Sequence, residues 1–215
     1  MKTKQTDFWS GEFGKEYTDR NTLENIDVWN DNYIKLYGVS RFDMFNTFLS
    51  GLDKESKILE VGCNTAQQLV ALQTLGFKTL YGIELQLYAV EKAKSITKNI
   101  NVIQGSAFDI PFKDEYFDLV MTNGVLIHIS PNDIPKVLSE IVRCSKKHIM
   151  GFEYFSEELK GVNYRGNKDF LWKMNYVQAY QNNFPNLSLK KEVQYPFIVE
   201  REKGNIDSMF LLQKK

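Results

Sequence analysis

Aromatic and apolar residues recur at helical spacing along the first fifty residues of the chain. Trp9, Phe13 and Tyr17 form one such stripe, and similar stripes follow over residues 29–37 and 42–49. A period between three and four places these side chains on one face of a helix, so two or three helices are expected here. Two glycines interrupt the first stripe, which favours a bent turn there over one continuous helix.

Short apolar runs alternate with helical stripes from residue 57 onward. The runs predict strands at residues 57–61, 78–83, 101–104, 116–122 and 148–152, and the stripes predict helices at 65–75, 87–97 and 131–142. Gly76 stands where it can end the first of these helices, because glycine readily adopts the left-handed conformation at a C-terminus. This alternation indicates an α/β fold with a parallel sheet and helices on both of its faces.

The last third of the chain departs from the alternation. A polar and aromatic insertion covers residues 156–184, with a loop at 164–166 and a helix expected over 172–180. Two β-like runs follow, at residues 188–200 and 205–213, and the turn between them is short enough for antiparallel pairing. The expected architecture is therefore a mostly parallel sheet that an antiparallel strand pair closes.

The length of 215 residues suits one α/β domain with a helical extension. We expect a helical cap at residues 1–50 and a core at 51–215, which includes the insertion. Lys and Arg together number 27, as do Asp and Glu, so the net charge is zero. A protein that binds nucleic acid needs a clustered basic excess, so no nucleic-acid partner is expected.

Cys63 and Cys144 are the only cysteines, and neither has a cysteine or histidine at metal-binding spacing. This pattern predicts neither a disulfide framework nor a metal site, and it suits a reducing compartment. The chain contains no apolar run of about 18 residues, so we expect no membrane span and no membrane partner. A soluble, cytoplasmic protein is the expectation.

The loop after the first predicted strand carries the strongest local signal. The strand contains Glu60, and the loop from Gly62 through Cys63 and Asn64 to Ala66 opens the next helix. Such a loop lets a ligand approach the backbone at the carboxyl edge of the sheet. It has neither the GxGxxG spacing of a dinucleotide site nor the lysine of a phosphate-binding loop. The acid repels a phosphate and favours a cationic ligand, although a plain β–α turn would show the same outline.

The next two loops belong to the same edge of the sheet. Glu84 ends the second strand, 22 residues after the glycine of the first loop, where an acid can accept both hydroxyls of a ribose. After the third strand, Phe108 can lie against a purine while Ser106 meets its edge. The alternatives are a solvated glutamate at a strand end and an aromatic that caps the core.

A fourth loop follows the strand at 116–122. Asn123 and Gly124 end that strand beside the first loop, where a backbone carbonyl can receive an amino group. His128 lies a few residues further on, where it can face a reacting atom. Two interpretations of this histidine stay open, a general base and a packed, hydrogen-bonded residue. His148, within a strand, is interpreted as structural.

Together these segments resemble the class I S-adenosylmethionine-dependent methyltransferases. The resemblance rests on E-x-G-C-N-T in the first loop, the acid after the second strand, G-S-A-F after the third and N-G-V-L-I-H-I-S-P after the fourth. At the level of the fold it covers residues 51–215, and the closing antiparallel pair matches the end of that fold. Ala66 replaces the last glycine of the family pattern, and Ser106 replaces an acid often seen beside adenine.

The resemblance implies a Rossmann-like sheet and S-adenosyl-L-methionine as the cofactor. Glu84 would then hold the ribose, Leu85 and Phe108 would enclose the adenine, and Glu60 would favour the cationic end. The full set of implied cofactor-binding residues is Glu60, Gly62, Cys63, Asn64, Ala66, Glu84, Leu85, Ser106, Ala107, Phe108, Asn123 and Gly124. A methyl group on a sulfonium is already activated, so the protein aligns the partners and excludes water, and no metal is implied.

A narrower resemblance covers nearly the whole chain. The opening F-W-S-G-E-F-G-K-E-Y-T-D-R-N at residues 8–21 is similar to that of methylases associated with pseudaminic acid biosynthesis, as are residues 169–174 after the 164–166 loop. That family implies a sugar, a nonulosonic acid or a nucleotide-linked precursor as the methyl acceptor. The expected process is surface glycan biosynthesis.

The helices of residues 1–50 are expected to form a lid over the site. Gly11 and Gly14 suit a hinge or a close approach of backbones. Tyr17 on this lid and His128 are the candidate catalytic side chains. Arg165, in the insertion, can pair with a carboxylate or phosphate of the acceptor. A helical cap that only buries core and an ordinary exposed arginine are the alternatives.

Other classes of function remain open from the sequence. A nicotinamide-dependent oxidoreductase shares the winding, but the missing GxGxxG counts against it. A non-catalytic cofactor-binding regulatory protein would show the same loops. Among methyltransferases, the acceptor can instead be another small metabolite or a protein side chain, and the oligomeric state stays undetermined.

Overall fold

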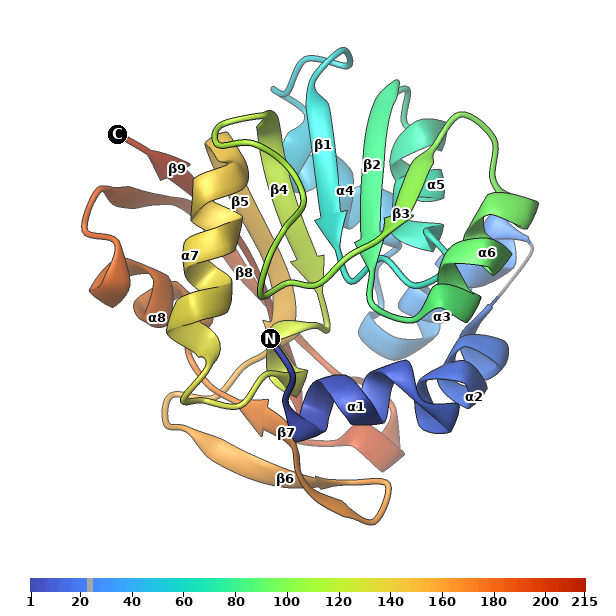
Figure 1. Ribbon diagram of the computed structural model, residues 1–215, viewed down its shortest axis with the longest axis vertical. Coiled ribbons are helices and arrows are strands. Elements are labelled where there is room, and N and C mark those ends of the chain that lie inside the picture. Colours follow the sequence, from blue (N-terminus) through green and yellow to red (C-terminus); the bar gives the residue numbers. More distant parts are fainter. Residues whose placement is uncertain (23–24) are drawn as a thin grey trace.

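The chain folds around a twisted seven-stranded sheet, seen in the computed structural model of residues 1–22 and 25–215 (Figure 1). The strand order is β3-β2-β1-β4-β5-β9-β8. The strands are β1 (Lys57–Val61), β2 (Thr79–Glu84), β3 (Asn101–Gln104), β4 (Phe117–Asn123), β5 (Ser145–Tyr154), β8 (Leu187–Pro196) and β9 (Ile206–Lys214). Strands β1 to β5 pair in parallel, whereas β9 pairs antiparallel with both β5 and β8. The predicted α/β class and its antiparallel closing pair are confirmed.

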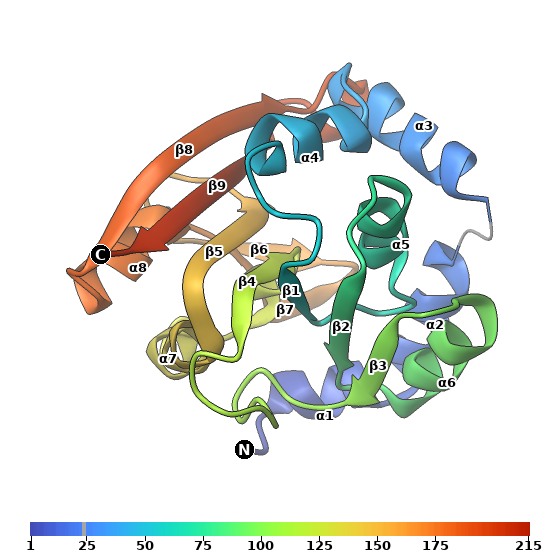
Figure 2. The same cartoon turned by 90° about the horizontal axis from the view of Figure 1, so that it is seen from above.

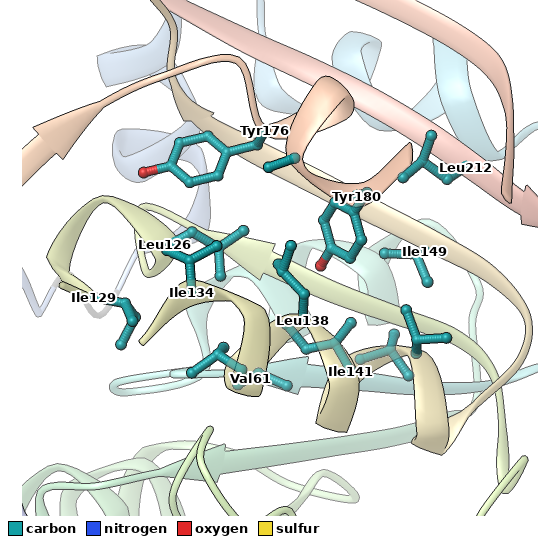
Figure 3. Close-up of a cluster of buried hydrophobic side chains, with 14 of the residues drawn as sticks. Val61, Leu126, Ile129, Ile134, Leu138, Ile141, Ile149, Tyr176, Tyr180 and Leu212 are labelled. Atoms are coloured by element: carbon teal, nitrogen blue, oxygen red, sulfur yellow. The ribbon is translucent and has the colours of Figure 1, made fainter. Parts of the chain in front are cut away.

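Helices cover both faces of this sheet (Figure 2). They are α1 (Lys4–Ser10), α2 (Glu12–Asn21), α3 (Ile26–Tyr37), α4 (Arg41–Leu49), α5 (Gln67–Thr74), α6 (Leu87–Ile96), α7 (Ile134–Cys144) and α8 (Tyr176–Asn183), with short 3-10 turns η1 (Leu126–His128) and η2 (Glu200–Glu202). One core cluster joins α7 and α8 to the sheet, and Figure 3 shows Leu138 and Ile141 of α7 close to Tyr180 of α8. A second cluster joins α3, α4, α5 and α6 to the other face.

The first fifty residues contain four helices in the described part of the chain, where two or three were expected. The first stripe breaks at Gly11, which is the C-cap of α1 and the N-cap of α2, so the expected bent turn is confirmed. Met44 and Phe45 of α4 are fully buried in the same cluster as Ile58 of β1. Within residues 1–50, α1 and α2 lie across the carboxyl edge of the sheet, and we call them the lid helices because the lid prediction concerns them (Figure 1).

The insertion differs from the prediction at its centre. The strand β7 (Asn167–Lys173), which includes the first two residues of the expected helix, pairs antiparallel with β6 (Lys160–Tyr164). Arg165 and Gly166 both have positive φ angles, of 49° and 84°, and two such residues in succession are what a tight hairpin turn requires. The helix α8 begins only after Asn175, whose side chain accepts a hydrogen bond from the Gln178 amide.

Smaller differences lie at the ends of elements. Helix α7 begins at Ile134, because residues 131–133 form a turn before it, and β5 extends by several residues at both ends of the predicted run. In the described residues, the helices are too short or too polar to cross a membrane.

Candidate functional site

A cavity of about 940 Å³ lies at the carboxyl edge of the sheet. The loops after β1, β2, β3 and β4 form one side of it, and α1, α2, α3 and the turn before β9 form the other. The predicted site residues that line it are Tyr17, Glu60, Gly62, Cys63, Asn64, Glu84, Leu85, Ser106, Ala107, Phe108, Asn123, Gly124 and His128. Ala66, which is fully buried at the start of α5, does not line it.

The loop between β1 and α5 alternates into the left-handed region of backbone conformation. Gly62, Asn64 and Ala66 have φ angles of 72°, 46° and 63°. A Cβ atom on Gly62 would come within 2.5 Å of Val125 Cγ2, so only glycine fits the first of these positions. Asparagine tolerates the left-handed region, whereas alanine is strained there. Positions 64 and 66 thus keep the conformation that glycine favours without being glycine.

Glu84 connects this loop to the loop after β2. Its Oε2 accepts a hydrogen bond from the Asn64 amide at 2.9 Å, and its Oε1 accepts one from the Gln86 amide at 2.9 Å. Burial raises the pKa of Glu84, and these backbone donors oppose the shift. The carboxylate is therefore held in place before any ligand arrives.

Glu60 is buried beside the same cavity. Its Oε1 accepts a hydrogen bond from Asn123 Nδ2 at 3.2 Å, while its Oε2 is fully buried and has no protein partner among the described residues. Burial raises the pKa of Glu60 to about 8. Asn64 Oδ1 is a second buried oxygen without a partner. Unpartnered buried polar atoms are rare in folded proteins. Of the four such side-chain atoms in the described residues, those of Trp9, Glu60 and Asn64 belong to residues that line the cavity, and Thr122 Oγ1 does not.

The aromatic residue of the loop after β3 is more deeply buried than stacking on a ligand requires. Phe108 is 3% exposed and packs with Ile83 and Ile110 in the core, although part of it reaches the cavity. Ser106 Oγ accepts a hydrogen bond from the Phe108 amide at 3.2 Å, which stabilises the turn. Capping of the core, one of the two interpretations of this aromatic, is thus part of its role, and Leu85 lines the cavity from the neighbouring loop.

His128 ends the 3-10 turn η1 between two aromatic rings. Its ring centroid lies 4.5 Å from that of Trp9 and 5.0 Å from that of Tyr164. Nδ1 lies 2.7 Å from the Phe170 carbonyl oxygen; since a carbonyl only accepts, Nδ1 carries the proton and Nε2 is an acceptor. Burial lowers the pKa of His128 to about 4, so the ring is neutral at pH 7. This histidine is packed and hydrogen-bonded, and it still lines the cavity.

Glu153, which the sequence analysis did not single out, supports this turn. It lies on β5, next to β4, and its carboxylate accepts hydrogen bonds from the Val125 and Ile127 amides at 3.3 and 3.4 Å. These donors belong to the segment that positions His128, and burial raises the pKa of Glu153 to about 7. An acid within an apolar strand (H-I-M-G-F-E-Y) was the available signal.

The lid helices α1 and α2 are attached on two sides of the cavity. Gln86 Nε2 donates to the Ser10 and Gly11 carbonyl oxygens at 2.9 Å each, and Gln5 Nε2 donates to the Asp169 carbonyl oxygen at 3.0 Å. The Nε1 atom of Trp9, also on the lid, is fully buried and has no partner among the described residues. The lid thus covers the site and contributes an unsatisfied donor to it.

Tyr17 of the lid and Arg165 of the insertion differ in their access to the cavity. The ring of Tyr17 lies edge-on to Trp9, with centroids 5.2 Å apart, and burial raises its pKa further above the ordinary value. Its hydroxyl therefore stays protonated at neutral pH. Arg165 is exposed in the β6–β7 turn and does not line the cavity, whereas Arg201 of η2 does. The acceptor contact of Arg165 stays a prediction.

A buried arginine behind the cavity was also missed. Arg41 begins α4, is fully buried, and donates from Nη2 to the Asn123 side-chain oxygen. An arginine directly after the N-cap Ser40 is typical of an exposed helix start, so the sequence offered no signal of its burial. The described residues contain no group of three or more side chains arranged to bind a metal ion.

Comparison with known proteins agrees with this geometry. Residues 59–152 match the family model of a methyltransferase domain. An uncharacterised methyltransferase of Synechocystis is 28% identical over 109 residues, which is 51% of this chain and 51% of that protein. The chain spans about half the length of the curated relatives it matches.

Solved structures extend the likeness of the fold to nearly the whole chain. A protein from Pyrococcus horikoshii has a TM-score of 0.66 and 16% identity, and the match covers 93% of this chain and 95% of that one. The Burkholderia thailandensis 1,6-didemethyltoxoflavin-N1-methyltransferase, solved with its substrate and S-adenosylhomocysteine, has a TM-score of 0.68 and 13% identity over 95% of this chain and 86% of its own. Residues 59–152 thus match a methyltransferase domain, and nearly the whole chain has a fold like that of solved S-adenosylmethionine-dependent methyltransferases.

Proposed function

We propose that this protein transfers a methyl group from S-adenosylmethionine to a hydroxyl group of a small molecule, with a sugar, a nonulosonic acid or a nucleotide-linked sugar as the favoured acceptor. The observation that carries the proposal is the set of buried, unpartnered polar atoms around one cavity, on Trp9, Glu60 and Asn64. Buried polar groups cost free energy unless a partner satisfies them, so these atoms indicate ligand partners.

The side chains on the sheet edge fit the cofactor. Glu84, already held by two backbone amides, is placed to accept the ribose hydroxyls, and Leu85 adds an apolar surface for the adenine. Glu60 Oε2 is available for the ammonium group of the methionyl part. The left-handed loop that begins at Gly62 leaves room for the ligand against its backbone.

The side chains under the lid fit a hydroxyl-bearing acceptor. A hydroxyl group both donates and accepts a hydrogen bond. His128 Nε2 is an acceptor and Trp9 Nε1 is an unsatisfied donor, and their rings lie 4.5 Å apart. Further along the cavity, Tyr37 donates from its hydroxyl to Asp207 Oδ2 at 2.5 Å, and Phe197 packs on Tyr37 with centroids 4.7 Å apart. Polar groups on aromatic walls suit the hydroxyls and the apolar faces of a sugar.

In this reaction the protein has to align the methyl donor with the acceptor and to accept one proton from the acceptor hydroxyl. Bound in the cavity, S-adenosylmethionine supplies an activated methyl group. The acceptor oxygen forms the new bond to carbon as the carbon–sulfur bond breaks, and the sulfur keeps that electron pair. His128 Nε2 takes the proton of the hydroxyl, and Trp9 Nε1 donates to the same oxygen and fixes its direction. The lid excludes water while this happens.

Positive charges among the cavity residues support an acidic or phosphorylated sugar. Arg20 of α2 and Arg201 of η2 both line the cavity. Arginine pairs well with a carboxylate or a phosphate, because its fork of donors matches two oxygens. We accordingly assign the protein to the modification of glycan precursors in the cytoplasm.

Two measurements test this function. Titration calorimetry with S-adenosylhomocysteine is expected to show one site per chain, and the absence of binding heat with either this product or the cofactor would contradict the assignment. Transfer of labelled methyl into the nucleotide-sugar and glycan fractions of a lysate is expected next. Label in proteins or in other small metabolites instead would move the acceptor to that class, and binding without any transfer would indicate a regulatory protein.

A further inference from the structure

Arg41 is a fully buried cation among aromatic rings and neutral polar groups, and the carboxyl groups of Glu60 and Asp207 are the acids that interact with it. Its guanidinium lies over the rings of Phe152, Phe45 and Tyr33, at 4.4, 4.5 and 5.2 Å from their centroids. Among the described residues, its hydrogen-bond partners are neutral: the side-chain oxygens of Gln68 and Asn123 and two methionine sulfurs. A guanidinium removed from water is costly without compensation, and an apolar side chain would pack on the same rings.

The contacts of Arg41 lead directly to Glu60. A guanidinium can only donate, so the oxygen of the Asn123 amide must face Arg41 and its NH₂ group must face the other way. That NH₂ group donates to Glu60 Oε1 at 3.2 Å. The second oxygen of Glu60, Oε2, is the one that has no protein partner beside the cavity. Arg41 therefore orients the amide that occupies one oxygen of Glu60 and leaves the other available.

We propose that Arg41 is a positioning residue for the methionyl end of the cofactor: through Asn123 it orients Glu60 and favours its ionisation when the cofactor's ammonium group meets Oε2. This inference rests on the proposed function, since it assigns a role to a residue behind the same site. Arg41 does not line the cavity, so it acts through its neighbours.

The other charged and titratable groups around Glu60 show why the positive charge matters. Glu84 of β2 lies near enough to disfavour a second carboxylate, and Tyr33 of α3 and Cys63 of the first loop are neutral groups beside it. Burial also favours the neutral acid, and Arg41 and the Asn123 hydrogen bond oppose both effects. Removing the cation therefore raises the pKa of Glu60 further, so ionising this carboxyl group when the cofactor's ammonium binds costs more free energy.

The test is titration calorimetry with S-adenosylhomocysteine from pH 6 to pH 9, in buffers of different ionisation enthalpy, which counts the protons released on binding. In the wild type, release from Glu60 is expected to have its midpoint near pH 8. Arg41→Met is expected to move the midpoint up by about one pH unit and to weaken binding about tenfold at pH 7, with a smaller loss as the pH rises. The ligand's own ammonium titrates alike in all variants. Arg41 also lowers the pKa of Asp207, which is about 7 and belongs to a residue of the same cavity, so only a difference that disappears in the Glu60→Gln background reports on Glu60.

Three further variants separate positioning from a merely structural role. Arg41→Lys keeps the charge and is expected to keep the midpoint, with weaker binding because the fork is lost. In the Glu60→Gln background, Arg41→Met is expected to change affinity less than twofold. Phe45→Leu removes a ring under Arg41 and is expected to lower the melting temperature without moving the midpoint.

The outcomes are distinguishable. A wild type that binds no S-adenosylhomocysteine contradicts the proposed function itself, and the role of Arg41 with it. A wild type that binds, together with an Arg41→Met variant whose midpoint stays near pH 8, contradicts the role of Arg41 alone. An equal loss from Arg41→Met with and without Glu60 does the same. If Arg41→Met does not fold, Arg41→Gln, which removes the charge and keeps hydrogen bonds, decides the question by the same midpoint.

Discussion

The two halves of the cavity are built in different ways. On the sheet edge, polar groups are held by backbone: Glu84 accepts from two amides, and the loop from Gly62 takes its shape from left-handed residues. Under the lid, aromatic rings from separate elements meet, with His128 between Trp9 and Tyr164. Side-chain hydrogen bonds such as those of Gln86 hold the lid there. The half proposed for the cofactor, here called the cofactor half, is thus held by backbone hydrogen bonds, whereas the half proposed for the acceptor, the acceptor half, depends on contacts of the lid helices.

The largest effect is expected from breaking the cofactor half. Gly62→Ala places a Cβ within 2.5 Å of Val125 Cγ2 and puts alanine at a φ angle of 72°. We expect a loss of about 2–4 kcal/mol in the free energy of unfolding, from backbone strain and overpacking together. Cofactor binding is expected to weaken by more than about 100-fold, because the strained and overpacked residues belong to the loop that contacts the ligand. Chemical denaturation and calorimetry measure the two quantities.

Gly166→Ala is the matched control for the backbone term. Gly166 also has a positive φ angle, of 84°, but a Cβ there meets nothing within 4 Å and the residue does not line the cavity. This variant is expected to lose only about 1 kcal/mol of stability and to bind the cofactor normally. Similar losses of binding in both variants would show that the close approach to Val125 is unimportant.

The next effect separates the acceptor half from the cofactor half. His128→Ala is expected to lower kcat by about 100-fold or more, since general-base catalysis typically contributes that much, while the affinity for S-adenosylhomocysteine changes less than about twofold. Equal values of kcat for the two proteins would remove His128 from the chemistry.

The pH dependence of kcat gives a second measurement of the same residue. Burial lowers the pKa of His128 to about 4, so Nε2 is unprotonated above that pH and protonated below it. At saturating cofactor, the contribution of His128 to kcat is therefore expected to be independent of pH from about 6 to 8. It is expected to fall as the pH approaches 4, where Nε2 becomes protonated. A midpoint near 6.5, the ordinary value for histidine, would mean that the ring is solvated during catalysis.

The sequence predicted the features that local patterns determine and missed those that depend on contacts between distant residues. The strands, the loops at their carboxyl ends and the acids at Glu60 and Glu84 follow from local patterns, because period and position in the chain decide them. The hairpin at residues 160–173 was missed because its strands are short and bury few residues, so they show no clear strand alternation. Arg41 and Glu153 were missed for a different reason: their importance depends on which distant residues they contact, and spacing carries no record of that.

A smaller effect is expected from loosening the lid. Gln86→Ala removes the hydrogen bonds to the Ser10 and Gly11 carbonyl oxygens. Such bonds contribute about 0.5–1.5 kcal/mol each on balance, and this pair is partly exposed. We expect kcat/KM to fall about three- to tenfold, with faster release of S-adenosylhomocysteine in stopped-flow measurements, because the lid opens more often.

Gln73→Ala provides the control for the loss of a glutamine. Its Nε2 donates to the Lys98 carbonyl oxygen at 2.9 Å, on the surface and away from the cavity. This variant is expected to leave both kcat/KM and the release rate unchanged. If Gln86→Ala behaves in the same way, neither the lid nor the acceptor half depends on this attachment.

The smallest effect is expected from Ala66→Gly, which changes the cofactor half in the opposite direction to Gly62→Ala. Glycine relieves the strain of alanine at a φ angle of 63°, which favours folding by about 1 kcal/mol, but it also removes a fully buried methyl group that is worth about as much. The two contributions oppose each other, so the free energy of unfolding should change by less than about 1 kcal/mol and cofactor affinity by less than about threefold. Glycine at position 66 can keep the same backbone shape. A nearly unchanged affinity in Ala66→Gly, together with a large loss in Gly62→Ala, would show that position 66 requires only the left-handed conformation, whereas position 62 also requires the absence of a side chain. A large loss of binding in Ala66→Gly would mean instead that the buried methyl group holds the start of α5 in place.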